Sequence, residues 1–283
     1  MLTTLLQPTE GTARVAGYDV REQPAKVRDN IGVVSQAMTL DVELTARENM
    51  ELHAKYFNIP KEIRRQRIKE LLDIVGLADK SDFTVGGYSG GMKRKLEIIR
   101  SLIHRPQVLF LDEPTTGLDP QARNAVWEYL RKIHKEENVT VMITTHYLDE
   151  ADVLCQRVAI VDYGEVIALG SPLELKRKVM GGDVVEVVFD SLSDEVLSAL
   201  QSADFVLELK RSENTLTLVV KSGAEAVPRI VELANNEGGK IHSVTLRAPT
   251  LDDVFLQFTG RSIREDTAVI RKRFVSTWER MRR

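Results

Sequence analysis

The chain has 283 residues, of which 43% are hydrophobic and 29% charged, a balance typical of a globular protein with one or two domains. Its formal net charge of −3 gives no case for nucleic acid as a partner, because nucleic-acid-binding domains are usually basic. A single cysteine, Cys155, excludes an internal disulfide, and its place in a helical run favours a small core residue over a nucleophile. No apolar run approaches the ~18 residues that span a bilayer, so the chain is not expected to form a channel, and no signal peptide is expected.

The first predicted elements are short strands. Residues 12–20 are expected to form a strand, a turn at Gly17 and a second strand. A buried strand follows at residues 31–35 and ends at Gln36, which is either an ordinary surface glutamine or a site residue.

A helical pattern then runs from Leu40 to Leu77. Thr45 is a predicted N-cap with Glu48 at the capping-box position, and a second helix is expected to begin at Pro60 and end at Gly76. The simplest interpretation makes four basic residues of this second helix its solvent-exposed face: Arg64, Arg65, Arg67 and Lys69.

The run from Tyr88 to Pro120 carries the residues that indicate chemistry. Ser89 is a predicted N-cap, and Gly90 and Gly91 leave first-turn N–H groups accessible to an anionic phosphate, with positive potential from Lys93, Arg94 and Lys95. Four apolar residues at 108–111 predict a strand buried on both faces, ending in Asp112 and Glu113. Asp112 suits Mg²⁺ and Glu113 suits the activation of water, although two acids in this place can also simply cap a helix.

After Gly117-Leu118-Asp119-Pro120 an amphipathic helix is expected to about residue 138, followed by a strand that ends at Thr144. His146 then lies at the carboxyl end of a strand beside 108–113, where a role in a site at that edge is favoured over a role as a turn histidine. Residues 157–170 predict a hairpin around Tyr163-Gly164.

A second domain is expected to begin near residue 181. Its elements follow the order βαββαβ, which predicts a ferredoxin-like sheet with a regulatory or dimer-forming role. The last residues, 270–283, are strongly basic with interspersed apolar residues, so they form either a solvated tail or a segment resting on anionic lipid or on a partner.

Together these motifs resemble the ATP-binding-cassette (ABC) ATPases. Ser89-Gly90-Gly91 resembles their signature motif, residues 108–113 their Walker B strand, and residues 117–120 their D-loop. His146 resembles the switch histidine, and Gln36 the Q-loop glutamine. The ending Leu251-Asp252-Asp253-Val254-Phe255 and the form Tyr-Ser-Gly-Gly-Met resemble the daunorubicin-resistance type of drug exporter within that family.

The resemblance implies an α/β P-loop NTPase-like cassette over residues 1–180 with a helical subdomain at about 40–100, an α+β domain over 181–262 and a basic tail over 263–283. It also implies ATP and Mg²⁺ as ligands, with Asp112 and Gln36 on the metal, Glu113 as base, and His146 on the γ-phosphate. Ser89, Gly90 and Gly91 would cap ATP held by a second cassette, with Asp119 linking the two sites. The resemblance further implies an integral membrane permease as the partner, with exposed apolar residues near 38–42 as the contact. A permease partner would place the protein on the cytoplasmic face of the membrane.

The phosphate-binding loop G-x-x-x-x-G-K-[ST] does not occur in the 283 residues. Each charge-assisted hydrogen bond to phosphate contributes about 1.5–3 kcal/mol, so a chain without the loop is expected to bind ATP poorly. Two explanations are compatible with the missing loop: a start site placed too late, or a naturally truncated subunit. The intact remaining motifs favour the late start site. The predicted function is the ATP-hydrolysing subunit of an exporter; the alternatives are a catalytically impaired regulatory cassette and a soluble cassette ATPase of DNA repair or translation.

Overall fold

The computed structural model describes residues 1–180 and 182–259. The chain divides into two compact units, and the boundary along the sequence lies between His146 and Tyr147. The basic tail expected at 263–283 lies outside the described residues. Within the described ranges, no helix combines the length and the apolar character needed to cross a membrane. The predicted domain limits, with a boundary near residue 181, stay a prediction.

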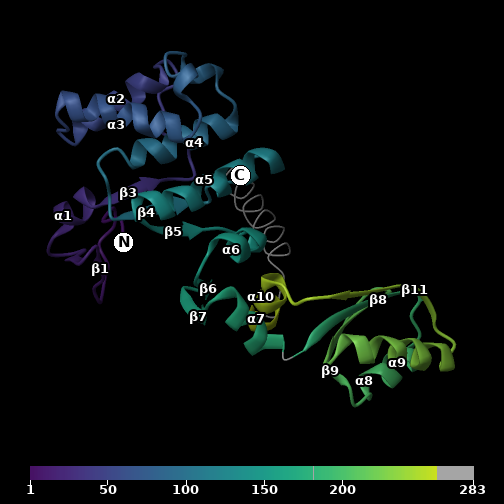
Figure 1. Ribbon diagram of the computed structural model, residues 1–283. Helices are drawn as coiled ribbons and strands as arrows, with labels where there is room; N and C mark the ends of the chain where they lie inside the picture. Colours follow the sequence, from purple (N-terminus) through teal and green to yellow (C-terminus); the bar gives the residue numbers. More distant parts are fainter. Residues whose placement is uncertain (181, 260–283) are drawn as a thin grey trace, which may run out of the picture. The chain divides into compact units, whose positions relative to one another are not determined.

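The first unit is built on a three-stranded parallel sheet in the order β3-β4-β5 (Figure 1). Its strands are β3 (Ile31–Val34), β4 (Val108–Asp112) and β5 (Thr140–Thr144), as the apolar runs predicted. Leu109 and Leu111 of the central strand are almost completely buried. Because the strands are parallel and Asp112 pairs with Thr144, the residues that follow all three strands meet at one edge.

Two helices that start at motif residues pack together beside this sheet: α4 (Gly90–Ser101) and α5 (Pro120–Glu137). Ser89 and Asp119 are their N-caps, each accepting a hydrogen bond from an N–H of the first turn. Helix α5 ends before Asn138, which adopts a left-handed conformation with φ of 52°. At the N-terminus, β1 (Arg14–Val15), β2 (Tyr18–Asp19) and α1 (Pro24–Asp29) pack against the start of the sheet.

The helical segment consists of α2 (Ala46–Tyr56) and α3 (Lys61–Ile74), followed by the short helices η1 (Ala78–Lys80) and η2 (Val85–Gly87). The predicted capping box of Thr45 and Glu48 is confirmed. The prediction that Arg67 is solvent-exposed is wrong, since this residue is only 6% exposed. Its guanidinium pairs with both carboxylate oxygens of Glu137 on α5, at 3.0 and 2.5 Å, and so joins the helical segment to the core.

The second unit begins with α6 (Leu148–Leu154), the hairpin β6 (Val158–Asp162) and β7 (Glu165–Gly170), and α7 (Pro172–Met180). The hairpin turn is the predicted one, with positive φ at Tyr163 and Gly164. Helix α10 (Leu251–Thr259) packs onto these elements through Leu251 and Val254. Its N-terminus is a capping box of Thr250 and Asp253.

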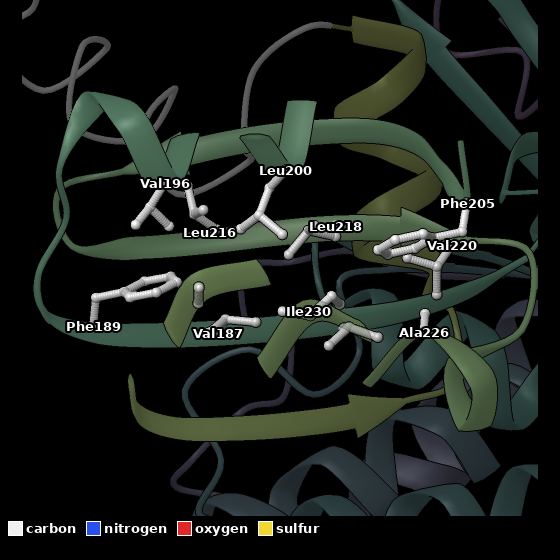
Figure 2. Close-up of a cluster of buried hydrophobic side chains, with 12 residues drawn as sticks. Val187, Phe189, Val196, Leu200, Phe205, Leu216, Leu218, Val220, Ala226 and Ile230 are labelled. Atoms are coloured by element: carbon white, nitrogen blue, oxygen red, sulfur yellow. The ribbon is translucent and has the colours of Figure 1, made fainter. Parts of the chain in front are cut away.

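The rest of the second unit has the predicted βαββαβ order: β8 (Asp183–Ser191), α8 (Asp194–Gln201), β9 (Val206–Ser212), β10 (Thr215–Val220), α9 (Gly223–Asn236) and β11 (Lys240–Arg247). The strands form one antiparallel sheet in the order β11-β8-β10-β9, the ferredoxin-like arrangement. Figure 2 shows the core between this sheet and its helices, where side chains of β8 and β10 meet those of α8 and α9. They include Val187, Phe189, Leu216, Leu218, Val196, Leu200 and Ile230.

Candidate active site

The site is organised by the turn that follows β4. Glu113, the first residue beyond the strand, has a φ of 45°, a left-handed conformation that is unfavourable for a residue with a side chain. Its N–H donates to the carbonyl oxygen of Thr144 at 3.0 Å, which ties the turn to the end of β5. Strained backbone of this kind persists only where the surrounding structure holds it, and it is frequent at active sites.

One carboxylate oxygen of Glu113 is the meeting point of three segments far apart in the sequence. Oε2 lies 3.3 Å from Nε2 of Gln36, 3.1 Å from Nδ1 of His146 and 2.8 Å from Oγ1 of Thr116. The Glu113 and His146 side chains are 27% and 42% exposed, so water and substrate can reach them. A partly exposed carboxylate held by three polar groups can accept a proton from a bound water. The structure thus brings Gln36, Glu113 and His146 together.

Asp112 points its carboxylate to the neighbouring strand, where Oδ1 accepts a hydrogen bond from Oγ1 of Thr144. Sequence reasoning did not single out Thr144 or Thr116, although both lie within the stretches that carry the motifs. No group of three or more His, Cys, Asp and Glu side chains placed to hold a metal occurs in the described part of the chain. A single carboxylate such as that of Asp112 still fits Mg²⁺, which commonly takes one or two protein ligands and completes its shell with water and phosphate oxygens.

Ser89, Gly90, Gly91 and Asp119 form a second group, at the N-termini of α4 and α5. Oγ of Ser89 accepts from the N–H of Met92 at 3.3 Å, and a carboxylate oxygen of Asp119 accepts from the N–H of Ala122 at 2.9 Å. A Cβ atom added at Gly91 would lie 3.0 Å from Cβ of Ala122. The absence of a side chain at Gly91 therefore allows the close packing of α4 against α5.

Arg94 has a different place from the one expected. The sequence suggested a cation that adds positive potential for phosphate, but this side chain is only 7% exposed. Its guanidinium donates to the main-chain carbonyls of Ser35, Asp112, Glu113 and Pro114, and pairs with Glu97. The donors of Arg94 are thus engaged within the protein.

Comparison with known proteins agrees with these motifs. A family model described as "ABC transporter" matches residues 1–116, and the "ATP-binding protein DrrA1-3-like, C-terminal domain" matches residues 170–259. The daunorubicin resistance ATP-binding protein DrrA2 of Streptomyces coeruleorubidus is 41% identical over 263 residues, which cover 92% of this chain and 81% of that protein. This chain belongs to the ATP-binding subunits of ABC transporters. It is therefore a member of a family of transport-coupled ATPases.

Two further relatives of this ABC subunit have different stated roles. The linearmycin resistance ATP-binding protein LnrL of Bacillus subtilis is 31% identical over 267 residues, covering 94% of this chain and 86% of that protein. A solved structure, cbiO1 of Clostridium perfringens, described as part of the ABC transporter complex cbiONQ, has a TM-score of 0.57 at 28% identity and covers 63% of this chain and 75% of that one. The relatives support the transport ATPase and do not favour the impaired regulatory cassette.

Proposed function

We propose that this ABC subunit hydrolyses ATP at the carboxyl edge of β3, β4 and β5, with Glu113 as the general base. The observation that carries the proposal is the convergence of Gln36, His146 and Thr116 on one oxygen of Glu113. In this assignment Glu113 accepts the proton of the attacking water, Gln36 orients that water, and His146 contacts the γ-phosphate.

Asp112, together with the amide oxygen of Gln36, is proposed to hold Mg²⁺. The ion, when bound with ATP, neutralises negative charge on the phosphate oxygens. The hydrogen bond from Thr144 to Oδ1 of Asp112 orients that carboxylate while leaving its other oxygen for a ligand. This division gives the two consecutive acids separate tasks.

Ser89, Gly90 and Gly91 are proposed to cap ATP held by a second cassette, so that two chains close head to tail around two nucleotides, with Asp119 linking the sites. The N-terminus of α4 supports this role, because the Ser89 cap leaves further first-turn N–H groups free of intrahelical partners. Residues 1–180 would form the cassette, with the helical subdomain at about 40–100, and residues 181–262 a regulatory or dimer-forming domain.

A membrane permease is the proposed partner, with the chain at the cytoplasmic face of the membrane. Met38 and Val42 are 49% and 46% exposed, and Phe83, next to a segment that bonds to residues 42–45, is 65% exposed. The N–H of Gly86 donates to the carbonyl oxygen of Val42 at 2.8 Å, which holds these two segments together. Apolar side chains exposed on adjacent segments fit a protein interface. The resistance proteins among the relatives support a drug-like export substrate.

The decisive experiment compares Glu113→Gln with the wild type, both produced with any coding sequence that precedes Met1 in the reading frame. We expect the kcat for Mg·ATP hydrolysis to fall about 100-fold or more while nucleotide affinity changes little, because the amide cannot accept the proton. Glu128→Gln, an exposed glutamate on α5, is the matched control and should keep the wild-type rate. Wild-type turnover by Glu113→Gln would contradict the proposal.

A further inference from the structure

The guanidinium of Arg94 contacts both segments that supply the proposed hydrolytic residues. On the β4 side it donates to the carbonyl oxygens of Asp112, Glu113 and Pro114 at 3.0, 3.2 and 2.7 Å. On the β3 side it donates to the carbonyl oxygen of Ser35, the residue before Gln36, at 2.8 Å. One buried side chain therefore fixes the main chain on both sides of the contact between Gln36 and Glu113.

The three carbonyls at 112–114 belong to the turn in which Glu113 has its left-handed φ. Consecutive carbonyl groups in an irregular turn need donors from elsewhere, and arginine offers five N–H groups in a rigid planar fork. A lysine ammonium cannot reproduce this arrangement, because its donors radiate from a single atom.

Glu97, one helical turn after Arg94, extends the network. It is 3% exposed, and its Oε2 lies 3.1 Å from Arg94, so the two buried charges compensate each other. Its other oxygen accepts from the N–H of Thr39 at 2.7 Å, and Arg100, a further turn along α4, donates to the carbonyl oxygen of Thr39 at 2.9 Å. The segment that carries Gln36 is thus held at Ser35 and at Thr39 by the same helix.

We propose that Arg94 is a positioning residue for ATP hydrolysis: with Glu97, it sets the placement of Gln36 relative to the base Glu113. The inference rests on the proposed roles of these two residues. Because Arg94 acts on main chain behind the site rather than on nucleotide, it should influence the rate of hydrolysis more than the binding of ATP.

The kinetic test uses Arg94→Lys and the double variant Arg94→Met/Glu97→Met. We expect Arg94→Lys to lower kcat about 10- to 100-fold, as loss of a residue that orients a site ligand commonly does, with KM changed less than about threefold. Replacing both buried charges by apolar groups avoids leaving Glu97 as an unpaired buried charge, but it also removes the donors to the carbonyl groups, so kcat should stay low. Arg67→Lys is the matched control, a second buried arginine paired with a carboxylate, and should lower thermal stability without lowering kcat.

Hydrogen exchange of the chain without nucleotide provides a readout independent of activity. Arg94→Lys should speed exchange at residues 112–117 and 36–42, whereas Arg67→Lys should leave both segments unchanged. Wild-type kcat in the double variant, or unchanged exchange in Arg94→Lys, would overturn the inference. Absence of hydrolysis by the wild type would count against the proposed function alone, since the exchange result still decides the role of Arg94.

Discussion

Gly91 packs so closely against Ala122 that a Cβ atom at position 91 would lie 3.0 Å from the Cβ of its neighbour. This contact joins the first turns of α4 and α5, the two helices capped by Ser89 and Asp119. The spacing between the signature motif and the D-loop is therefore set inside one chain, before any second cassette is present.

The contact yields a prediction that separates packing from nucleotide access. Gly91→Ala should lower the free energy of unfolding by about 1–3 kcal/mol, because the added methyl group overpacks the contact. Adding Ala122→Gly should recover much of that loss. If Gly91 must also admit a phosphate, the ATPase rate of the double variant should stay low. Urea unfolding and ATP turnover are measured on both variants, and Ala122→Gly alone is the control.

His146 provides a second prediction. Its Nδ1 atom lies 3.1 Å from Glu113, and its side chain is 42% exposed at the proposed position of the γ-phosphate. His146→Ala should reduce kcat about 100-fold with a small effect on thermal stability, because the ring is not part of the buried core. His242→Ala, a histidine whose side chain is 70% exposed in the second unit, is the control. Equal turnover in both variants would rule out a direct role for His146.

The exposed ring of Phe83 gives a prediction about the permease. Phe83→Asp should weaken co-purification with the permease at least tenfold, because a carboxylate placed in an apolar interface loses its hydration. Basal hydrolysis without permease should be unchanged, since Phe83 is 65% exposed and lies outside the site. Tyr56→Asp, the same kind of aromatic-to-carboxylate change at a residue 79% exposed on α2, is the matched control. Identical co-purification of the two variants would place the contact elsewhere.

The buried pair of Arg67 and Glu137 predicts a large cost for removing one partner. Arg67→Ala should lower the free energy of unfolding by about 2–4 kcal/mol, since it leaves a partly buried carboxylate without its cation. The pair holds the pKa of Glu137 below its ordinary value, chiefly through the hydrogen bond from Arg67. Arg65→Ala, an exposed residue of the same helix, should cost less than about 0.5 kcal/mol in urea unfolding.

His53 predicts how stability depends on pH. Burial, and then the charges of Arg100 and His104, lower the pKa of His53 to about 4. In the unfolded chain the ring takes up a proton near pH 6.5, so between about pH 6.5 and 4 the unfolded state binds more protons and stability decreases as the pH falls. His53→Gln should reduce this decrease by on the order of 1–2 kcal/mol, allowing for solvent screening of the partly exposed ring. Urea unfolding at pH 7.5 and 5 measures this difference in the free energy of unfolding. His242→Gln, the exposed control, should leave the pH dependence unchanged.

Local sequence patterns predicted much of the fold. The apolar run at 108–111, the cap at Thr45 and the turn at Tyr163-Gly164 depend on residues within a few positions of each other, and all three are confirmed. The expected place of His146 beside Glu113 followed from a property of parallel strands, whose carboxyl ends share an edge, whereas the place of Gln36 in the site was implied by the family resemblance.

The buried arginines could not be predicted in the same way. An interpretation based on helical periodicity assigns Arg67 and Arg94 to the solvent-exposed face, because charged side chains are assumed to be exposed. Their burial depends on partners remote in the sequence: Glu137 is 70 residues from Arg67, and Pro114 is 20 residues from Arg94. Only the tertiary structure places a carboxylate or a row of carbonyl groups beside them.

The order β11-β8-β10-β9 leaves β9 at one edge of the antiparallel sheet, within the part of the chain that the structure describes. Glu208, Lys210 and Arg211 give this strand a dense row of charges. Charged side chains on an edge strand oppose the addition of a further strand from another molecule, which protects the sheet from intermolecular aggregation. Association of this sheet with a second molecule is therefore not expected to use backbone hydrogen bonds along β9.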